Sequence, residues 1–217
     1  EPIRRLTAIG VRLEDGTDDY KRVGMFYQYS GGWRTGDNGL TMQWDLVDIV
    51  GLLANREYIV PSVLPITLSG WIASLVSQLG PNFTQSYTVD AAYADLAVTA
   101  TAKDNVTGKK CGDILRWACL ATGTWPRADA ATGKLAVEPL WNEGNKITLD
   151  NLTDYPVMRA NNDLAAILFT LSDGNKTQYV VSGNATASGE TVSVDDPFIH
   201  TEAQARTAAK LILACYG

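Results

Sequence analysis

The sequence contains very little histidine and cysteine, the residues that most often bind transition metals or act as nucleophiles. Its 217 residues include one histidine, His200, and three cysteines, Cys111, Cys119 and Cys215. A lone histidine excludes a multi-histidine zinc site, and these cysteines lack zinc-finger spacing. Cys111 and Cys119 fall about 12 Å apart along one predicted helix, which is too far for a disulfide. We therefore expect reduced thiols that serve as small core residues, as in a protein made in a cytoplasm.

Sequence motifs for phosphate binding and for nucleophilic catalysis are also missing. The chain has no P-loop, no G-x-G-x-x-G and no nucleophile elbow. Its carboxylates are scattered, so no pair stands out as the two acids of a glycosidase, and Asp195 and Asp196 are interpreted as part of a loop before Pro197. His200 precedes a predicted helix, where a structural role is favoured. We therefore predict that the protein is not an enzyme and has no catalytic, cofactor-binding or metal-binding residues.

Positive charge and long apolar runs are scarce as well. Lysine and arginine number 18 against 24 acidic residues, which gives a net charge of -6. A protein that grips DNA or an anionic membrane usually carries a basic patch, and a membrane span needs roughly 20 apolar residues. We expect neither specific nucleic-acid binding nor a membrane span. The chain opens on Glu1-Pro2 without methionine or a signal peptide, which favours a piece of a longer protein.

The rest of the composition is that of a folded protein, with 46% hydrophobic residues over a length that suits one or two domains. Residues 1–43 are rich in alternating strand patterns, and a short amphipathic helix is predicted over 45–54. Residues 56–66 contain Pro61 and Pro65 and are interpreted as a linker or an edge strand. These features place a first, β-rich unit at 1–58.

The next unit, 59–140, alternates helices with pairs of strands. A helix is expected from its N-cap Thr67 to Gly80, followed by strands at 83–89 and 96–101. A second helix over 107–122 ends at Gly123, and strands at 124–128 and 134–138 form a hairpin. This order predicts a small α+β domain. Its expected core residues are Ile72, Leu75, Val76, Leu79, Cys111, Ile114, Leu115 and Ala118.

The last unit, 141–217, returns to strands at 147–149, 164–171, 178–182 and 191–194. A final helix begins at Thr201, which forms a capping box with Gln204. Each flank of the chain has too few strands to bury its own apolar face. We therefore expect 141–217 to pack with 1–58, so that 59–140 is an inserted domain.

Tryptophans and N-x-T sequons support a different function. Trp33, Trp44, Trp125 and Trp141 lie near predicted turns or strand ends, where exposed aromatic rings can bind sugars or protein partners, although packing in a core or a subunit interface is favoured. The five sequons begin at Asn82, Asn105, Asn151, Asn175 and Asn184. These features keep open the alternative of a secreted or surface module for glycan binding or adhesion.

Several local strings resemble a family of tailed-phage tail proteins. The strings lie at 24–27, at 40–53, at 112–125 with the hairpin ending Gly133-Lys134-Leu135, and at 194–201. In the last string, Val194 to Thr201, the family has an N-P-[FL]-I step into a helix. Asp196 stands here where asparagine is commoner. The chain is similar over most of its length to baseplate-hub, or late-control-D-like, tail proteins, of which it would form only a part.

This resemblance implies a fold and a role. The fold is α+β, with β-barrel-like strands from both ends of the chain and an inserted small α+β domain. The role is that of a non-enzymatic structural protein at the tail tip of a phage or prophage, assembled in the bacterial cytoplasm into the virion tail. Its partners would be other tail proteins and further copies of itself, in a trimer. If the chain lines a channel, acidic residues such as Asp173, Asp195 and Asp196 would keep DNA from sticking.

Overall fold

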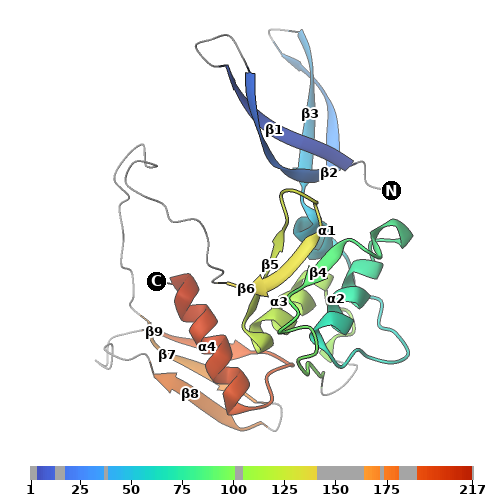
Figure 1. The fold of residues 1–217 in the computed structure, drawn as a ribbon. Coiled ribbons are helices and arrows are strands. Elements are labelled where there is room, and N and C mark those ends of the chain that lie inside the picture. Colours follow the sequence, from blue (N-terminus) through green and yellow to red (C-terminus); the bar gives the residue numbers. More distant parts are fainter. Residues whose placement is uncertain are drawn as a thin grey trace.

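The computed structural model describes residues 4–12, 18–36, 39–100, 105–140, 164–171, 174–180 and 190–216. These ranges form three separate three-stranded sheets and four α-helices, so the chain has a mixed α+β fold. Figure 1 shows the first sheet at one end of the molecule, the last sheet with its helix at the other, and the remaining elements between them. Among the described residues, no helix combines the length and apolar character that crossing a membrane requires.

The N-terminal sheet is an antiparallel meander of β1 (Arg4–Arg12), β2 (Asp18–Gly36) and β3 (Gly39–Val47). The helix predicted over 45–54 starts later, because residues 45–47 still pair with β2. Helix α1 (Ile49–Asn55) follows its N-cap Asp48, whose side chain accepts a 2.7 Å hydrogen bond from the Gly51 N–H. This cap satisfies a backbone donor that the first turn leaves open.

The middle unit contains two further helices and a small sheet. Helix α2 (Leu68–Ser77) is capped by Thr67 as predicted, and helix α3 (Cys111–Thr122) ends at Gly123, which has the left-handed φ of 72°. Strands β5 (Thr124–Ala128) and β6 (Leu135–Pro139) form the expected hairpin, and β4 (Tyr87–Val89) joins β6 in parallel. The order is therefore β4-β6-β5.

Three predicted boundaries in this unit are wrong. Residues 96–100 form no strand, because their only pairing is an isolated bridge between Ala97 and Thr67, the residue that caps α2. The Trp71 indole N–H adds a 2.8 Å bond to the Val98 carbonyl. Phe83 belongs to the short 3-10 helix η1 (Pro81–Phe83) that Pro81 starts, so only 87–89 pair as a strand. Helix α3 begins at Cys111 rather than at 107, because Gly108 turns the chain with a φ of 70°.

The C-terminal unit is a sheet covered by a helix (Figure 1). Strand β7 (Leu164–Thr170) lies between β8 (Lys176–Val180), which is antiparallel to it, and β9 (Glu190–Asp195), which is parallel. Helix α4 (Glu202–Tyr216) begins with the predicted capping box, in which the Gln204 N–H donates to Thr201 Oγ1 at 3.2 Å. The Thr201 N–H donates back to Gln204 Oε1.

One core cluster joins all three units. The Tyr27 ring of β2 lies 5.3 Å from that of Phe83, and Trp71 of α2 lies 4.9 Å from Phe198, just before α4. The predicted core is confirmed except that Leu79 is only partly buried. The largest fully buried side chains are Trp71, Phe169, Phe198, Ile49, Leu53, Leu68, Ile72, Leu75, Ile114, Leu115, Leu135 and Ile167.

The barrel-like arrangement of the two ends is not confirmed. In the described ranges no strand of the β1–β3 sheet pairs with a strand of the β7–β9 sheet, and no sheet closes on itself. The strand predicted at 147–149 lies outside the described residues. The division into 1–58, 59–140 and 141–217, with direct packing of the first unit on the last, stays a prediction.

Candidate interaction surface

The cysteines of the described core have no reactive character. Cys111 and Cys119 are buried and unpaired, as expected. Burial raises the pKa of the Cys111 thiol to about 11 and that of Cys119 to about 12, so both stay protonated at neutral pH. The described residues contain no group of three or more histidine, cysteine or acidic side chains placed to hold a metal.

His200 holds two parts of the fold together. Its ring Nε2 contacts the Thr99 carbonyl oxygen, and its backbone N–H donates to Gln204 Oε1 at 2.9 Å. The contact with Thr99 joins the start of α4 to the segment that pairs with the N-cap of α2. These two contacts give His200 a structural role at the entry to α4.

Asp196 differs from the exposed loop residue that the sequence suggested. Its side chain is only 3% exposed, and Oδ1 accepts a 2.9 Å hydrogen bond from the Phe198 N–H. Its Oδ2 is buried and has no hydrogen-bond partner among the described residues. Burial raises the pKa of this carboxyl to about 7. A buried side chain cannot form part of an acidic channel wall, whereas Asp195 is exposed and Asp173 lies outside the described residues.

The segment 59–66, which we call the apolar segment, presents large apolar side chains to solvent. Ile59, Val63 and Ile66 are 69%, 79% and 67% exposed. Hydrogen bonds fix both ends, from the Tyr58 N–H to the Lys109 carbonyl and from the Val98 N–H to the Ile66 carbonyl, each at 2.9 Å. Three large apolar side chains exposed within eight residues make this segment a candidate contact surface. The sequence did not reveal this surface, because apolar residues around two prolines also suit a linker or an edge strand.

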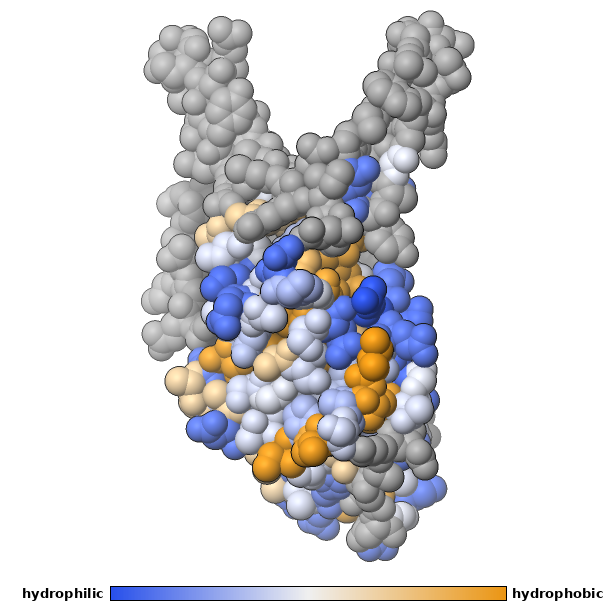
Figure 2. All heavy atoms as spheres, turned by 90° about the vertical axis from the view of Figure 1, so that its right-hand side faces the viewer, coloured by the Kyte–Doolittle hydropathy of each residue, from blue (hydrophilic) through white to orange (hydrophobic). Residues whose placement is uncertain are grey.

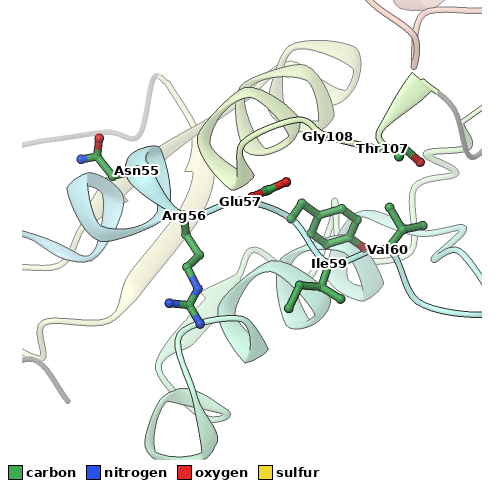
Figure 3. A pocket seen from close by; sticks show the side chains of 8 residues that line it. Asn55, Arg56, Glu57, Ile59, Val60, Thr107 and Gly108 are labelled. Carbon is green, nitrogen blue, oxygen red and sulfur yellow. The ribbon is translucent and has the colours of Figure 1, made fainter.

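A groove of about 710 Å³ adjoins the start of the apolar segment (Figure 3). Its lining residues are Asn55, Arg56, Glu57, Tyr58, Ile59, Val60, Thr107 and Gly108. Tyr58 is fixed by a 2.8 Å hydrogen bond to Ser74, and burial raises the pKa of its hydroxyl. Figure 3 shows the Arg56 and Glu57 side chains pointing apart. The groove offers no histidine or cysteine for chemistry, and its mixture of exposed apolar and charged groups suits a contact with another chain.

Figure 2 shows the face of the molecule that carries α2 and the apolar segment. Apolar side chains appear there in separate groups among polar ones. A discontinuous pattern of this kind is also that of an ordinary protein surface, so the hydropathy of this face does not by itself mark an interface.

The tryptophans that the structure describes differ in how far their side chains are exposed. Trp71 is fully buried with its indole N–H bonded, Trp117 is partly buried, and Trp125 on β5 is 44% exposed. The side chains of Trp33, Trp44 and Trp141 lie outside the described residues. Trp125 is thus the one exposed aromatic ring that the structure describes among the four candidates.

Two solved structures of tail proteins, one of them from a prophage, share this fold. A tail protein from Neisseria meningitidis MC58 superposes with a TM-score of 0.56 and 14% identity, over 92% of this chain and 62% of that one. The 43 kDa tail protein of prophage MuSo2 from Shewanella oneidensis superposes with a TM-score of 0.58 and 15% identity, over 99% of this chain and 66% of that one. No protein-family model and no curated protein matches the sequence.

The chain thus spans slightly less than two thirds of the length of either tail protein. At this level of identity the likeness establishes the fold, which is that of a part of these tail proteins.

Proposed function

We propose that the chain is a structural component of a phage or prophage tail and acts through contacts with other proteins. The observation that carries this proposal is the fold, shared over 92% of the chain with a tail protein and over 99% with a prophage tail protein. The exposed apolar segment supports it, since a protein that works by assembly needs a surface of this kind. In this proposal the protein has no catalytic role.

The specific place that we propose is the baseplate hub at the tail tip. The local strings at 112–125 and 194–201, which resemble hub proteins, form the helix-to-hairpin step and the entry to α4 in the structure. We propose assembly in the bacterial cytoplasm, contacts with neighbouring tail proteins, and a trimer in the full assembly. The outer strands of the β1–β3 and β7–β9 sheets have unpaired edges in the described ranges, which suits strand pairing that completes a ring on assembly.

The apolar segment is the surface that we assign to a neighbouring tail protein. Ile59, Val63 and Ile66 expose most of their surface, and the adjacent groove offers Arg56 and Glu57 for polar contacts at the rim. The hydrogen bonds at both ends of the segment reduce the entropy that binding would cost.

A co-purification experiment tests this proposal. The chain is co-expressed with each tail protein encoded beside it, and binding is measured for the parent, for the triple variant Ile59→Ser, Val63→Ser, Ile66→Ser, and for Trp125→Ser. We expect a partner to bind the parent, at least about tenfold weaker binding to the triple variant, and parent-like binding to Trp125→Ser. Equal binding by the parent and the triple variant would contradict the assigned surface. Binding to none of the tail proteins would contradict the role.

A further inference from the structure

The turn between β9 and α4, residues 196–200, anchors the C-terminal unit on the middle unit, and we call it the entry turn. Phe198 in this turn is fully buried, and its ring lies 4.9 Å from that of Trp71 in α2. His200 at the end of the turn contacts the Thr99 carbonyl oxygen through its ring Nε2. Any change that opens the entry turn therefore loosens a contact between two units of the fold.

A buried carboxyl group lies inside this turn. The Ile199 N–H donates to the Asp196 carbonyl oxygen at 3.1 Å, and the Phe198 N–H donates to Asp196 Oδ1 at 2.9 Å. The Asp196 side chain is 3% exposed, and its Oδ2 is buried without a hydrogen-bond partner among the described residues. A buried charge needs hydrogen bonds or a counter-charge, and one N–H bond is too little for a carboxylate. The closed turn therefore favours the protonated acid.

The charged groups around Asp196 do not compensate for its burial. Arg116 on α3 attracts the ionised carboxyl and Asp195 on β9 repels it. Arg116 is 72% exposed and lies 3.8 Å from Asp113, so it offers Asp196 only a screened charge. Strand β7, helix α2 and residues 96–100 contain no charged residue. The charged side chains of the described part of α4 are exposed, namely Glu202, Arg206 and Lys210.

We propose that the entry turn is a pH-sensitive joint, closed on the middle unit while the Asp196 carboxyl is protonated and released when that carboxyl ionises. An ionised carboxyl gains hydration by moving into solvent. That movement breaks the bond from the Phe198 N–H, and the Phe198 ring then loses its fixed position against Trp71. The joint is a local property of this turn and does not rest on the proposed tail function.

Proton linkage gives the sign and the range of the effect. In the open turn the carboxyl is solvated and has its ordinary pKa of 3.8, whereas in the closed turn burial raises the pKa to about 7. Between these values the closed turn binds the proton and the open turn does not, so the opening constant rises about tenfold per pH unit. Above about pH 7 it levels off. From pH 5 to pH 8 the total rise is about 100-fold.

Amide hydrogen exchange of the whole chain, measured by NMR from pH 5 to pH 8, tests this joint. Dividing each rate by the intrinsic exchange rate at that pH gives the opening constant. The amides of Phe198 and Ile199 report on the entry turn, and the amide of Trp71, which donates to the Thr67 carbonyl, reports on the middle unit. For the turn we expect the rise of about 100-fold. At pH 8 its opening constant should exceed that of Trp71 at least about tenfold and depend less on urea, because a local opening exposes little surface.

Two variants assign the effect to one carboxyl group. Asp196→Asn keeps an acceptor for the Phe198 N–H but cannot ionise, so the opening constant of the turn should stay constant from pH 5 to pH 8. Asp195→Asn is the matched control, because it removes the neighbouring exposed charge and leaves Asp196 in place. Most of the rise should remain in this control.

Three results would overturn the proposal. One is an opening constant at Phe198 and Ile199 that is the same at pH 5 and pH 8. Another is exchange of these amides with the same opening constant and urea dependence as the Trp71 amide, which would mean that pH acts on global unfolding alone. The third is an unchanged rise in Asp196→Asn. The first two results come from the parent chain, so they decide the matter even where a variant does not fold.

Discussion

Replacing Asp196 with asparagine should remove a strong dependence of stability on pH. The Asp196 carboxyl is almost completely buried between β9 and α4, with one oxygen bonded to the Phe198 N–H and the other without a partner in the described structure. Burial is the main reason why its pKa rises from 3.8 to about 7, and the negative charge of Asp195 adds to the rise. The Phe198 hydrogen bond and the positive charge of Arg116 oppose it. Asparagine keeps the shape and the Oδ1 acceptor but carries no charge.

The sign and size of the expected change in unfolding free energy follow from proton linkage. Between about pH 4 and pH 7 the folded chain keeps the proton on Asp196 while the unfolded chain loses it, so the free energy of unfolding falls as the pH rises. The difference between a pKa of 3.8 and one of about 7 corresponds to about 4 kcal/mol, lost progressively over that range and constant above it. The stability of Asp196→Asn relative to the parent should therefore rise by about 4 kcal/mol from pH 4 to pH 8.

Urea unfolding followed by tryptophan fluorescence at several pH values from 4 to 8 measures this change. The other titrating groups contribute alike to the parent and to Asp196→Asn, so their contributions cancel in the difference between the two free energies of unfolding. Asp195→Asn is the matched control: it removes a neighbouring charge from an exposed position, so most of the parent's fall in stability should remain. Parallel stability curves for the parent and Asp196→Asn would refute the reasoning, because they would mean that Asp196 titrates alike in the folded and unfolded chains.

Three further changes test the packing and the helix ends, each by the free energy of unfolding in urea. Leu75→Ala should cost about 2–5 kcal/mol because Leu75 is fully buried in the shared core, and parent-like stability would contradict that burial. Thr201→Ala should cost about 1 kcal/mol through loss of the cap of α4, and no loss would mean that the capping box contributes nothing. Gly123→Ala should destabilise the protein more than Gly108→Ala does. Both glycines have a φ near 70°, but only at Gly123 would the new Cβ lie 2.5 Å from a side-chain atom, that of Thr207. Equal losses would contradict close packing of α3 on α4.

Features with a local physical mechanism could be predicted from the sequence. The cap at Thr67, the left-handed glycines Gly123 and Gly133, and the capping box at Thr201 all depend on residues within one turn of each other. The apolar stripe around Leu75 likewise needs only the period of the helix.

The errors arise where distant residues decide the structure. Residues 96–100 are fixed by Trp71, 27 positions before its partner Val98, and by His200, 101 positions after Thr99. Asp196 looks like a solvated loop residue in the sequence, but folding leaves only 3% of it exposed. Propensity and pattern contain no information on such contacts.

The candidate surfaces show the same limit. Trp125 was recognisable as an aromatic ring near a strand end, but its ion-paired neighbours follow from strand register. The exposure of the apolar segment follows from how its two ends are bonded to 98 and 109. Neither the ion-paired neighbours of Trp125 nor the exposure of the apolar segment can be predicted from composition.

The central claim is that this chain is a structural part of a phage tail, and electron cryo-microscopy of purified particles tests it most directly. Particles from the phage or prophage that encodes the chain are imaged and their proteins are identified by mass spectrometry. The account predicts the chain at the tail tip, in a multiple of three copies, with the apolar segment against a neighbouring tail protein. Complete tails that lack the chain would contradict the account.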